Sequence, residues 1–164
     1  MSYFIIIRGP LGCGKSIIAR RLVKILNAEH ISIDEILAKN GLDEINPEIG
    51  CIPEENFIKV NEIIIPHASE MLIKGRIVIF DACFYHKEPI EHLIRELKHP
   101  YYVFTFKAPV GVCIERDSKR KKGYGEIAAK DVHRLVSRFD YGIIIDVTKP
   151  LDNSIEEILS HLPK

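Results

Sequence analysis

Short apolar runs alternate with segments of helical periodicity from one end of the 164-residue chain to the other. Five of these runs are rich in β-branched and aromatic residues and predict strands at 3–8, 30–33, 76–80, 101–106 and 143–146. The runs are apolar throughout and do not alternate with polar residues. This pattern is typical of strands that are buried on both faces of a parallel sheet.

Between these runs, apolar residues recur every three to four positions and predict amphipathic helices over 18–26, 90–97 and 132–139. A last helix is predicted to begin at a capping box, Ser154-x-x-Glu157. The segment 54–74 also has helical spacing, but Pro66 interrupts it, which predicts a kinked helix or two short ones. Strands alternating with helices predict an α/β fold with a doubly wound parallel sheet, in which ligands bind beyond the carboxyl ends of the strands.

A glycine-rich loop directly follows the first predicted strand and opens the first predicted helix. It matches the pattern G-x-x-x-x-G-K-[ST] with the residues Gly9, Pro10, Leu11, Gly12, Cys13, Gly14, Lys15 and Ser16. Glycines let several backbone N–H groups converge on one anion, and the helix N-terminus adds a favourable partial charge. The pattern therefore predicts a phosphate-binding loop that extends to Ile17, with Lys15 on the β- and γ-phosphates and the Ser16 hydroxyl on Mg²⁺.

Two alternatives for this loop carry less weight. One is a plain glycine-rich turn that ends a strand. The other is a dinucleotide site, since Asp34 lies 20 residues beyond Gly14. Its glycines would be spaced G-x-G-x-x-G, whereas these are spaced G-x-x-G-x-G, and Lys15 and Ser16 would have no function in such a site.

Asp81 follows the third predicted strand, as the Walker-B carboxylate does, and is predicted to hold the metal or one of its waters. The alternative is that Asp81 caps the following turn. The next residue is Ala82, where many ATPases have a glutamate that activates water. This difference favours phosphoryl transfer to an acceptor other than water.

Asp34 is predicted to lie at the end of the second strand, on the acceptor side of the site. A carboxylate there can orient an acceptor hydroxyl and take its proton during transfer. The alternative is that Asp34 only caps the helix that follows.

A basic, glycine-punctuated segment at about 116–127 is predicted to form a lid over the triphosphate. Arg116 and Arg120 are the candidates for binding phosphate, and Arg116 also for stacking on a base. Residues 119, 121 and 122 form a lysine run that is typical of a solvated surface. Beyond the lid, residues 130, 134 and 138 are basic at four-residue spacing, which suits either an anionic acceptor or an exposed helix face.

These motifs together resemble the small P-loop kinases. The residues that carry the resemblance are the glycine-rich loop, the two acids and a C-x-x-R-D-x-x-R stretch that begins at Cys113. The nearest likeness is to the AAA-type kinase group, with polynucleotide kinase and chloramphenicol phosphotransferase; adenylylsulfate, gluconate and shikimate kinases are more distant. The resemblance implies a P-loop NTPase fold of three layers, α/β/α, with strand order 2-3-1-4-5, ATP as donor and Mg²⁺. It also places the adenine near the loop after the fifth strand, beside Lys149 and Pro150.

Composition limits the remaining classes. The chain is 46% hydrophobic and 28% charged, with a formal net charge of zero, so it lacks the global basic field of many nucleic-acid-binding proteins. No apolar run reaches the roughly 18–20 residues of a membrane span, and no signal peptide is recognised. The four cysteines form no CxxC pair and the histidines have no zinc spacing, so we expect free thiols in a cytoplasmic protein.

The sequence as a whole predicts a single domain over residues 1–164 that transfers the γ-phosphoryl group of ATP to a hydroxyl. The acceptor could be a small molecule, a nucleoside or nucleotide, or a 5′-hydroxyl end of a nucleic acid. The alternative is a nucleotide-dependent switch or ATPase module that acts on a protein partner.

Overall fold

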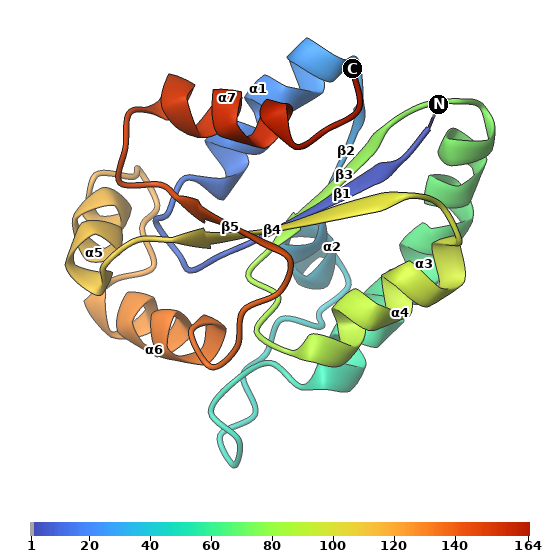
Figure 1. Ribbon diagram of the computed structural model, residues 1–164. Coiled ribbons are helices and arrows are strands. Elements are labelled where there is room, and N and C mark those ends of the chain that lie inside the picture. Colours follow the sequence, from blue (N-terminus) through green and yellow to red (C-terminus); the bar gives the residue numbers. More distant parts are fainter. Residues whose placement is uncertain (1) are drawn as a thin grey trace.

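A computed structural model describes residues 2–164 and contains one five-stranded sheet, with all strands parallel (Figure 1). The strands are β1 (Phe4–Arg8), β2 (Glu29–Ser32), β3 (Val78–Ala82), β4 (Tyr101–Lys107) and β5 (Ile143–Asp146). Their order across the sheet is β2-β3-β1-β4-β5, which confirms the order implied by the resemblance.

Helices cover both faces of the sheet and make the three layers that were predicted (Figure 1). They are α1 (Lys15–Leu26), α2 (Ile33–Lys39), α3 (Glu54–Ile73), α4 (Lys87–Leu97), α5 (Val110–Ser118), α6 (Glu126–Val136) and α7 (Leu151–Ser160). One hydrophobic core lies under α1 and α7, and the other lies under α3, α4 and α6. Because both faces are covered, neighbouring residues of one strand enter different cores: Phe4 and Ile6 pack in one, Ile5 and Ile7 in the other.

The end of the chain differs from the prediction. The last helix begins at Leu151, so the predicted capping box is wrong. Pro150 occupies the N-cap position and starts the helix one turn earlier than expected. Ser154 is therefore a buried residue inside α7, and its hydroxyl donates to the Asp146 carbonyl oxygen at 3.5 Å.

Of the two alternatives at Pro66, two short helices are ruled out, because α3 is one continuous helix of 20 residues that contains this proline. Proline removes a single backbone N–H donor. Buried side chains on both sides of it, among them Phe57, Ile64 and Leu72, hold the helix against the core. Over residues 2–164, no helix combines the length and the apolar character that crossing a membrane requires.

Arg8, the last residue of β1, is a fully buried cation that the sequence pattern did not single out. Its guanidinium donates to the carbonyl oxygens of Phe84 at 3.2 Å, Val136 at 2.9 Å and Phe139 at 3.0 Å, and to the Thr105 hydroxyl at 3.2 Å. Burial lowers the pKa of Arg8 to about 10, which the charge of Asp140 partly opposes. Arg8 thus joins the carboxyl ends of β3 and β4 to the end of α6.

We expect Arg8→Met to lower the free energy of unfolding by about 3–5 kcal/mol, because it leaves several buried acceptors without a donor. Arg21→Met is the matched control, since Arg21 makes only an exposed ion pair with Asp152 at 3.1 Å. The control should change stability by less than about 1 kcal/mol. Urea unfolding of both variants measures the difference, and equal small losses would contradict the role assigned to Arg8.

Candidate active site

The glycine-rich loop joins the carboxyl end of β1 to the N-terminus of α1, as predicted. Gly12 and Gly14 have φ angles of 77° and 95°, which other residues rarely adopt. The loop also packs closely against the start of the lid: a Cβ on Gly12 would lie 2.2 Å from the Cys113 carbonyl oxygen. A Cβ on Gly9 would lie 2.9 Å from the Cys13 sulfur. Gly12 is therefore required by packing as well as by backbone conformation, Gly9 by packing alone and Gly14 by backbone conformation alone.

We expect Gly12→Ala to destabilise the fold by about 2–5 kcal/mol, since it combines an unfavourable φ with a clash against the backbone of α5. Gly14→Ala is the matched control, because it has a similar φ but nothing within 4 Å of the added Cβ. The control should show only the conformational cost, about 1–2 kcal/mol. Thermal unfolding of the two variants separates these contributions, and equal losses would refute the packing argument.

Lys15 is buried at the base of the loop, and its ammonium group donates to the Pro10 carbonyl oxygen at 2.9 Å. Burial alone would lower its pKa. The neighbouring thiols of Cys13 and Cys83 and the carboxylates of Asp34 and Asp81 outweigh burial, so the pKa of Lys15 lies above its ordinary value. The side chain is therefore a fixed positive charge at physiological pH.

Asp34 and Asp81 lie close enough to Lys15 for their charges to interact. Burial raises the pKa of Asp34 and nearby Asp81 adds to the rise, while Lys15 and hydrogen bonds from Cys83 oppose it; the resulting pKa is about 6. Asp34 is thus ionised at neutral pH but titrates far closer to it than an ordinary aspartate. A carboxylate of this kind is suited to accept a proton.

Asp34 lies neither at the end of the second strand nor at the cap of the following helix, the two positions that the sequence suggested. β2 ends at Ser32, and Asp34 is the second residue of α2, with Ser32 in the N-cap position. Asp34 is therefore neither at the strand end nor the helix cap. The first turn of α2 brings its carboxylate back toward the Cys83 backbone, which follows β3.

Asp81 lies inside β3, one residue before its end, and is almost fully buried. It contacts the imidazole of His30, from the adjacent strand β2. Sequence reasoning missed His30, because only the parallel pairing of β2 with β3, with Ser32 opposite Asp81, brings the two side chains together. Nothing in the spacing of the histidines indicates this contact.

The basic segment predicted as a lid comprises the last turn of α5, a loop over 119–125, and the start of α6. Buried Asp117 anchors this loop, because its carboxylate accepts the backbone N–H groups of Tyr124 at 3.1 Å and Gly125 at 2.9 Å. Arg116 donates to the Cys13 carbonyl oxygen at 3.4 Å, so it contacts the phosphate loop directly. Arg120 is half-exposed, with its guanidinium over the Tyr124 ring.

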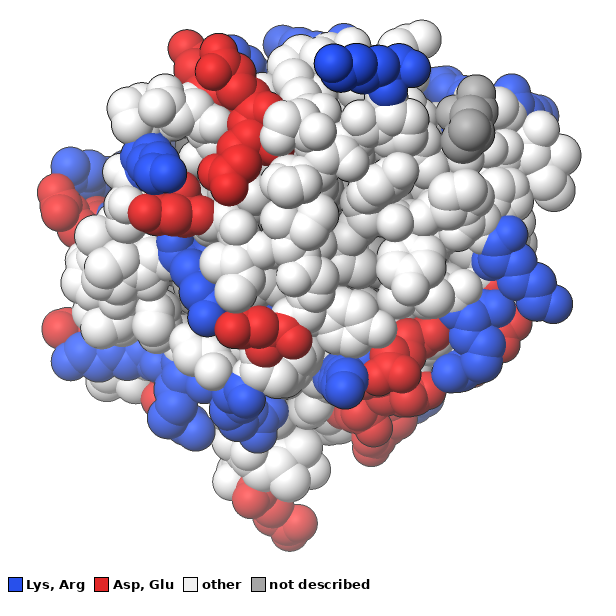
Figure 2. All heavy atoms as spheres, in the orientation of Figure 1, with Lys and Arg blue, Asp and Glu red and all other residues white. Residues whose placement is uncertain are grey.

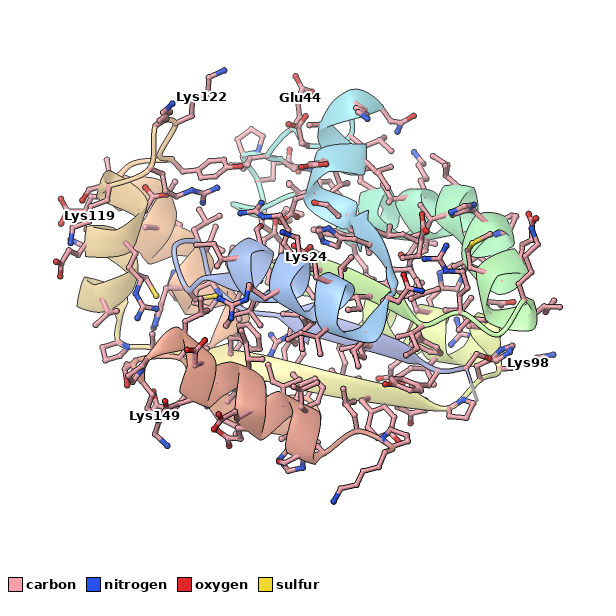
Figure 3. All side chains as sticks on the ribbon, turned by 90° about the horizontal axis from the view of Figure 1, so that it is seen from above. Lys24, Glu44, Lys98, Lys119, Lys122 and Lys149 are labelled. Atoms are coloured by element: carbon pink, nitrogen blue, oxygen red, sulfur yellow. The ribbon has the colours of Figure 1, made fainter. Side chains whose placement is uncertain are left out.

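Viewed from above, the lid loop and the segment 41–53 project on the same side of the molecule, with Lys122 on one and Glu44 on the other (Figure 3). Lys and Arg side chains also gather over α6 (Figure 2). Lys130 of this helix forms an ion pair with Glu126 at 3.2 Å. Lys119 pairs with Glu115 at 3.1 Å, which fits the solvated interpretation of the lid lysines.

The loop after β5 lies beside the start of α7, with Lys149 and Pro150 both exposed (Figure 3 labels Lys149). Asp146 fixes the loop, because it accepts the Thr148 backbone N–H at 2.9 Å. A cavity of about 420 Å³ at the carboxyl ends of β4 and β5 reaches the phosphate loop at Pro10 and α6 at His133. A base contact for Arg116, Lys149 and Pro150 stays a prediction.

The fold and the loop define a P-loop nucleotide-binding protein of the α/β class. A family model described as an AAA domain matches residues 4–140, and the chain belongs to this family. No curated protein matches the chain significantly in sequence.

Three solved structures show the same fold. A sugar kinase from Janibacter sp. HTCC2649 has a TM-score of 0.76 at 17% identity, with 98% of this chain and 94% of that chain covered. A gluconokinase from Sinorhizobium meliloti 1021 has a TM-score of 0.68 at 15% identity, covering 95% and 89%. A shikimate kinase from Aquifex aeolicus has a TM-score of 0.60 at 22% identity, covering 96% and 94%. Family and fold therefore agree with the resemblance to small P-loop kinases.

Proposed function

We propose that this protein is a kinase that transfers the γ-phosphoryl group of ATP to a hydroxyl of a small molecule. One observation carries the proposal: Lys15 of the phosphate loop, Asp81 of β3 and Asp34 of α2 form one electrostatically coupled cluster. A phosphate-binding lysine, a metal-supporting acid and an acid of raised pKa are the parts that transfer to a hydroxyl requires. The similarity to kinases of sugars and of shikimate supports a small-molecule acceptor over a nucleic-acid end.

The residues present fit a magnesium ion. Mg²⁺ in phosphoryl-transfer sites takes one or two protein ligands, with phosphate oxygens and waters completing its shell. Ser16 has an exposed hydroxyl in the first turn of α1, and Asp81 supplies a carboxylate from β3. Mg²⁺ bound there would neutralise charge on the phosphates, as it does in related chemistry.

Each group of residues at the site has a separate role in phosphoryl transfer. The loop from Gly9 to Ser16 binds the phosphates through backbone N–H groups at the N-terminus of α1. Lys15 offsets the charge that develops on the transferred group. Asp34 orients the acceptor hydroxyl and takes its proton. Arg116 and Arg120 approach from the lid side and exclude water.

A screen for acceptor-dependent ADP formation tests this function. Purified protein with ATP and Mg²⁺ should form ADP slowly alone and much faster with one hydroxyl compound among sugars, polyols, hydroxy acids, nucleosides and 5′-hydroxyl oligonucleotides. Full-rate ADP formation without any acceptor would instead support an ATPase or switch module. Stimulation by the oligonucleotides alone would overturn the small-molecule acceptor.

A further inference from the structure

Two arginines lie near the end of α6, and no ion pair neutralises either of them within the described residues. Arg134 lies in the last turn of α6, and Arg138 lies in the turn that follows. Within residues 2–164, neither has a carboxylate oxygen within 4.0 Å, whereas Lys130 on the same helix pairs with Glu126. Two like charges four residues apart repel each other, so this arrangement is unfavourable unless an anion offsets it.

Hydrogen bonds fix the head of Arg138. Its guanidinium donates to the Tyr85 carbonyl oxygen at 3.2 Å and to the Leu135 carbonyl oxygen at 3.3 Å. Tyr85 belongs to the segment 83–86 directly after β3, so Arg138 lies against the chain that leaves the metal-supporting strand. These two hydrogen bonds hold the guanidinium in one position.

The charges of Arg134 and Arg138 also reach Cys51, in the segment that precedes α3. Burial raises the pKa of the Cys51 thiol, and the charges of both arginines oppose that rise. Cys51 lies 3.8 Å from the His86 imidazole, and the Ile52 backbone N–H donates to the Tyr85 hydroxyl at 3.0 Å. The segments 51–53 and 83–86 and the end of α6 therefore meet where the two cations lie.

The same short segment connects these cations to Asp34. Cys83 hydrogen-bonds Asp34 at one end, and Tyr85 accepts from Arg138 two residues later. Two residues span at most about 7 Å. Between them, Phe84 has a φ of 43°, a strained conformation for a residue other than glycine, and its carbonyl oxygen accepts a hydrogen bond from Arg8. The segment 83–85 therefore contacts both the proton acceptor Asp34 and the cation Arg138.

We infer that the acceptor carries an anionic group, a carboxylate or a phosphate ester, in addition to the hydroxyl that is phosphorylated, and that Arg134 and Arg138 bind this group. The inference rests on the proposed kinase function and names its substrate class. Both anions accept paired hydrogen bonds from guanidinium groups, which explains arginine at both positions. The hydroxyl would lie at Asp34 and the anion at the end of α6.

Inorganic phosphate and acetate are the first probes, with a non-hydrolysable ATP analogue and Mg²⁺ occupying the phosphate loop. Calorimetry should show millimolar binding of at least one anion to the wild type and a loss of about tenfold or more in Arg134→Gln/Arg138→Gln. Lys130→Gln is the matched control and should bind like the wild type. Arg134→Gln alone changes an exposed side chain and keeps the test valid if the double variant unfolds.

Matched acceptors supply the second measurement: glycerate and glycerol 3-phosphate against glycerol, and gluconate and glucose 6-phosphate against glucose. At least one anionic acceptor should bind or turn over where the matching neutral compound does not. Whether the carboxylates or the phosphate esters do so identifies the anionic group that the site binds. In the double variant KM for that acceptor should rise about 10–100-fold with nucleotide affinity unchanged.

Two outcomes overturn the inference: neutral members that bind as well as anionic ones, or a double variant that keeps wild-type anion affinity and KM. A purely structural role of the arginines at the end of α6 would give the second outcome. Failure of the kinase proposal is distinguishable, because it would abolish acceptor-dependent ADP formation while anion binding at the two arginines persisted.

Discussion

Lys15→Ala should reduce ATP-dependent phosphoryl transfer by roughly 10³-fold or more while the protein stays folded. Lys15 is the buried positive charge of the phosphate loop, and its pKa lies above the ordinary lysine value. Its charge acts on the phosphates at the moment when negative charge shifts from the γ-phosphoryl group to ADP. Single-turnover ADP formation with the identified acceptor measures the loss, and circular dichroism checks the fold.

Lys24→Ala is the matched control, because Lys24 lies in the last turn of the same helix and is exposed (Figure 3). It should have wild-type activity. A Lys15 variant that retains more than a tenth of wild-type turnover would refute the assignment of the phosphate loop. The substitution also removes a charge that lowers the pKa of Asp34, so in Lys15→Ala that carboxyl should titrate above about pH 6.

Asp34→Asn should lower kcat by roughly 10²–10⁴-fold and leave ATP affinity nearly unchanged. The pKa of Asp34 is about 6 because the carboxylate is buried beside Asp81, so it is ionised and basic at neutral pH. In the wild type, kcat should therefore fall tenfold per pH unit below about pH 6. The variant should lack this limb of the profile.

Glu35→Gln is the control for Asp34, since Glu35 is the next residue of α2 and is exposed. It should keep both the wild-type kcat and the wild-type pH profile. Equal losses of ATP binding and transfer in Asp34→Asn would remove the acceptor role of Asp34.

Stability supplies an independent readout of Asp34. The folded-state pKa of about 6 lies above the unfolded value of about 3.9, so the fold favours the protonated form. The ionised group therefore destabilises the fold increasingly as pH rises from about 4 to 6, and fully above that. Asp34→Asn should be more stable than the wild type at pH 8 by about 1–2 kcal/mol, less than the full pKa shift implies because residue 34 is only partly buried and solvent screens its charge. The advantage should vanish near pH 4, as urea titrations at the two pH values would show.

The pattern of hydrophobic and polar residues along the chain was sufficient to predict most of the strands and helices. Five apolar runs predicted the five strands, since a strand covered on both faces cannot contain many polar residues. The predicted burial holds for the central strands, whereas the edge strands β2 and β5 are only partly buried. The glycine-rich loop was recognisable because its function requires particular residues at fixed spacing along one continuous stretch of chain. The error at the last helix arose where the backbone of Pro150 overrode the local capping signal, and packing of α3 decided that the helix continues through Pro66.

The sequence by itself determined the strands, the order of the motifs and the phosphate loop, because each is encoded in residues close together along the chain. Only the tertiary structure decided which side chains surround Lys15, that His30 contacts Asp81, and that Arg8 joins β3 and β4 to the end of α6. It also separated Lys130, which is paired, from Arg134 and Arg138, which have no ion pair among residues 2–164. These relations depend on parallel strand pairing and helix docking between segments up to 131 residues apart, and no local pattern of hydrophobic and polar residues contains that information.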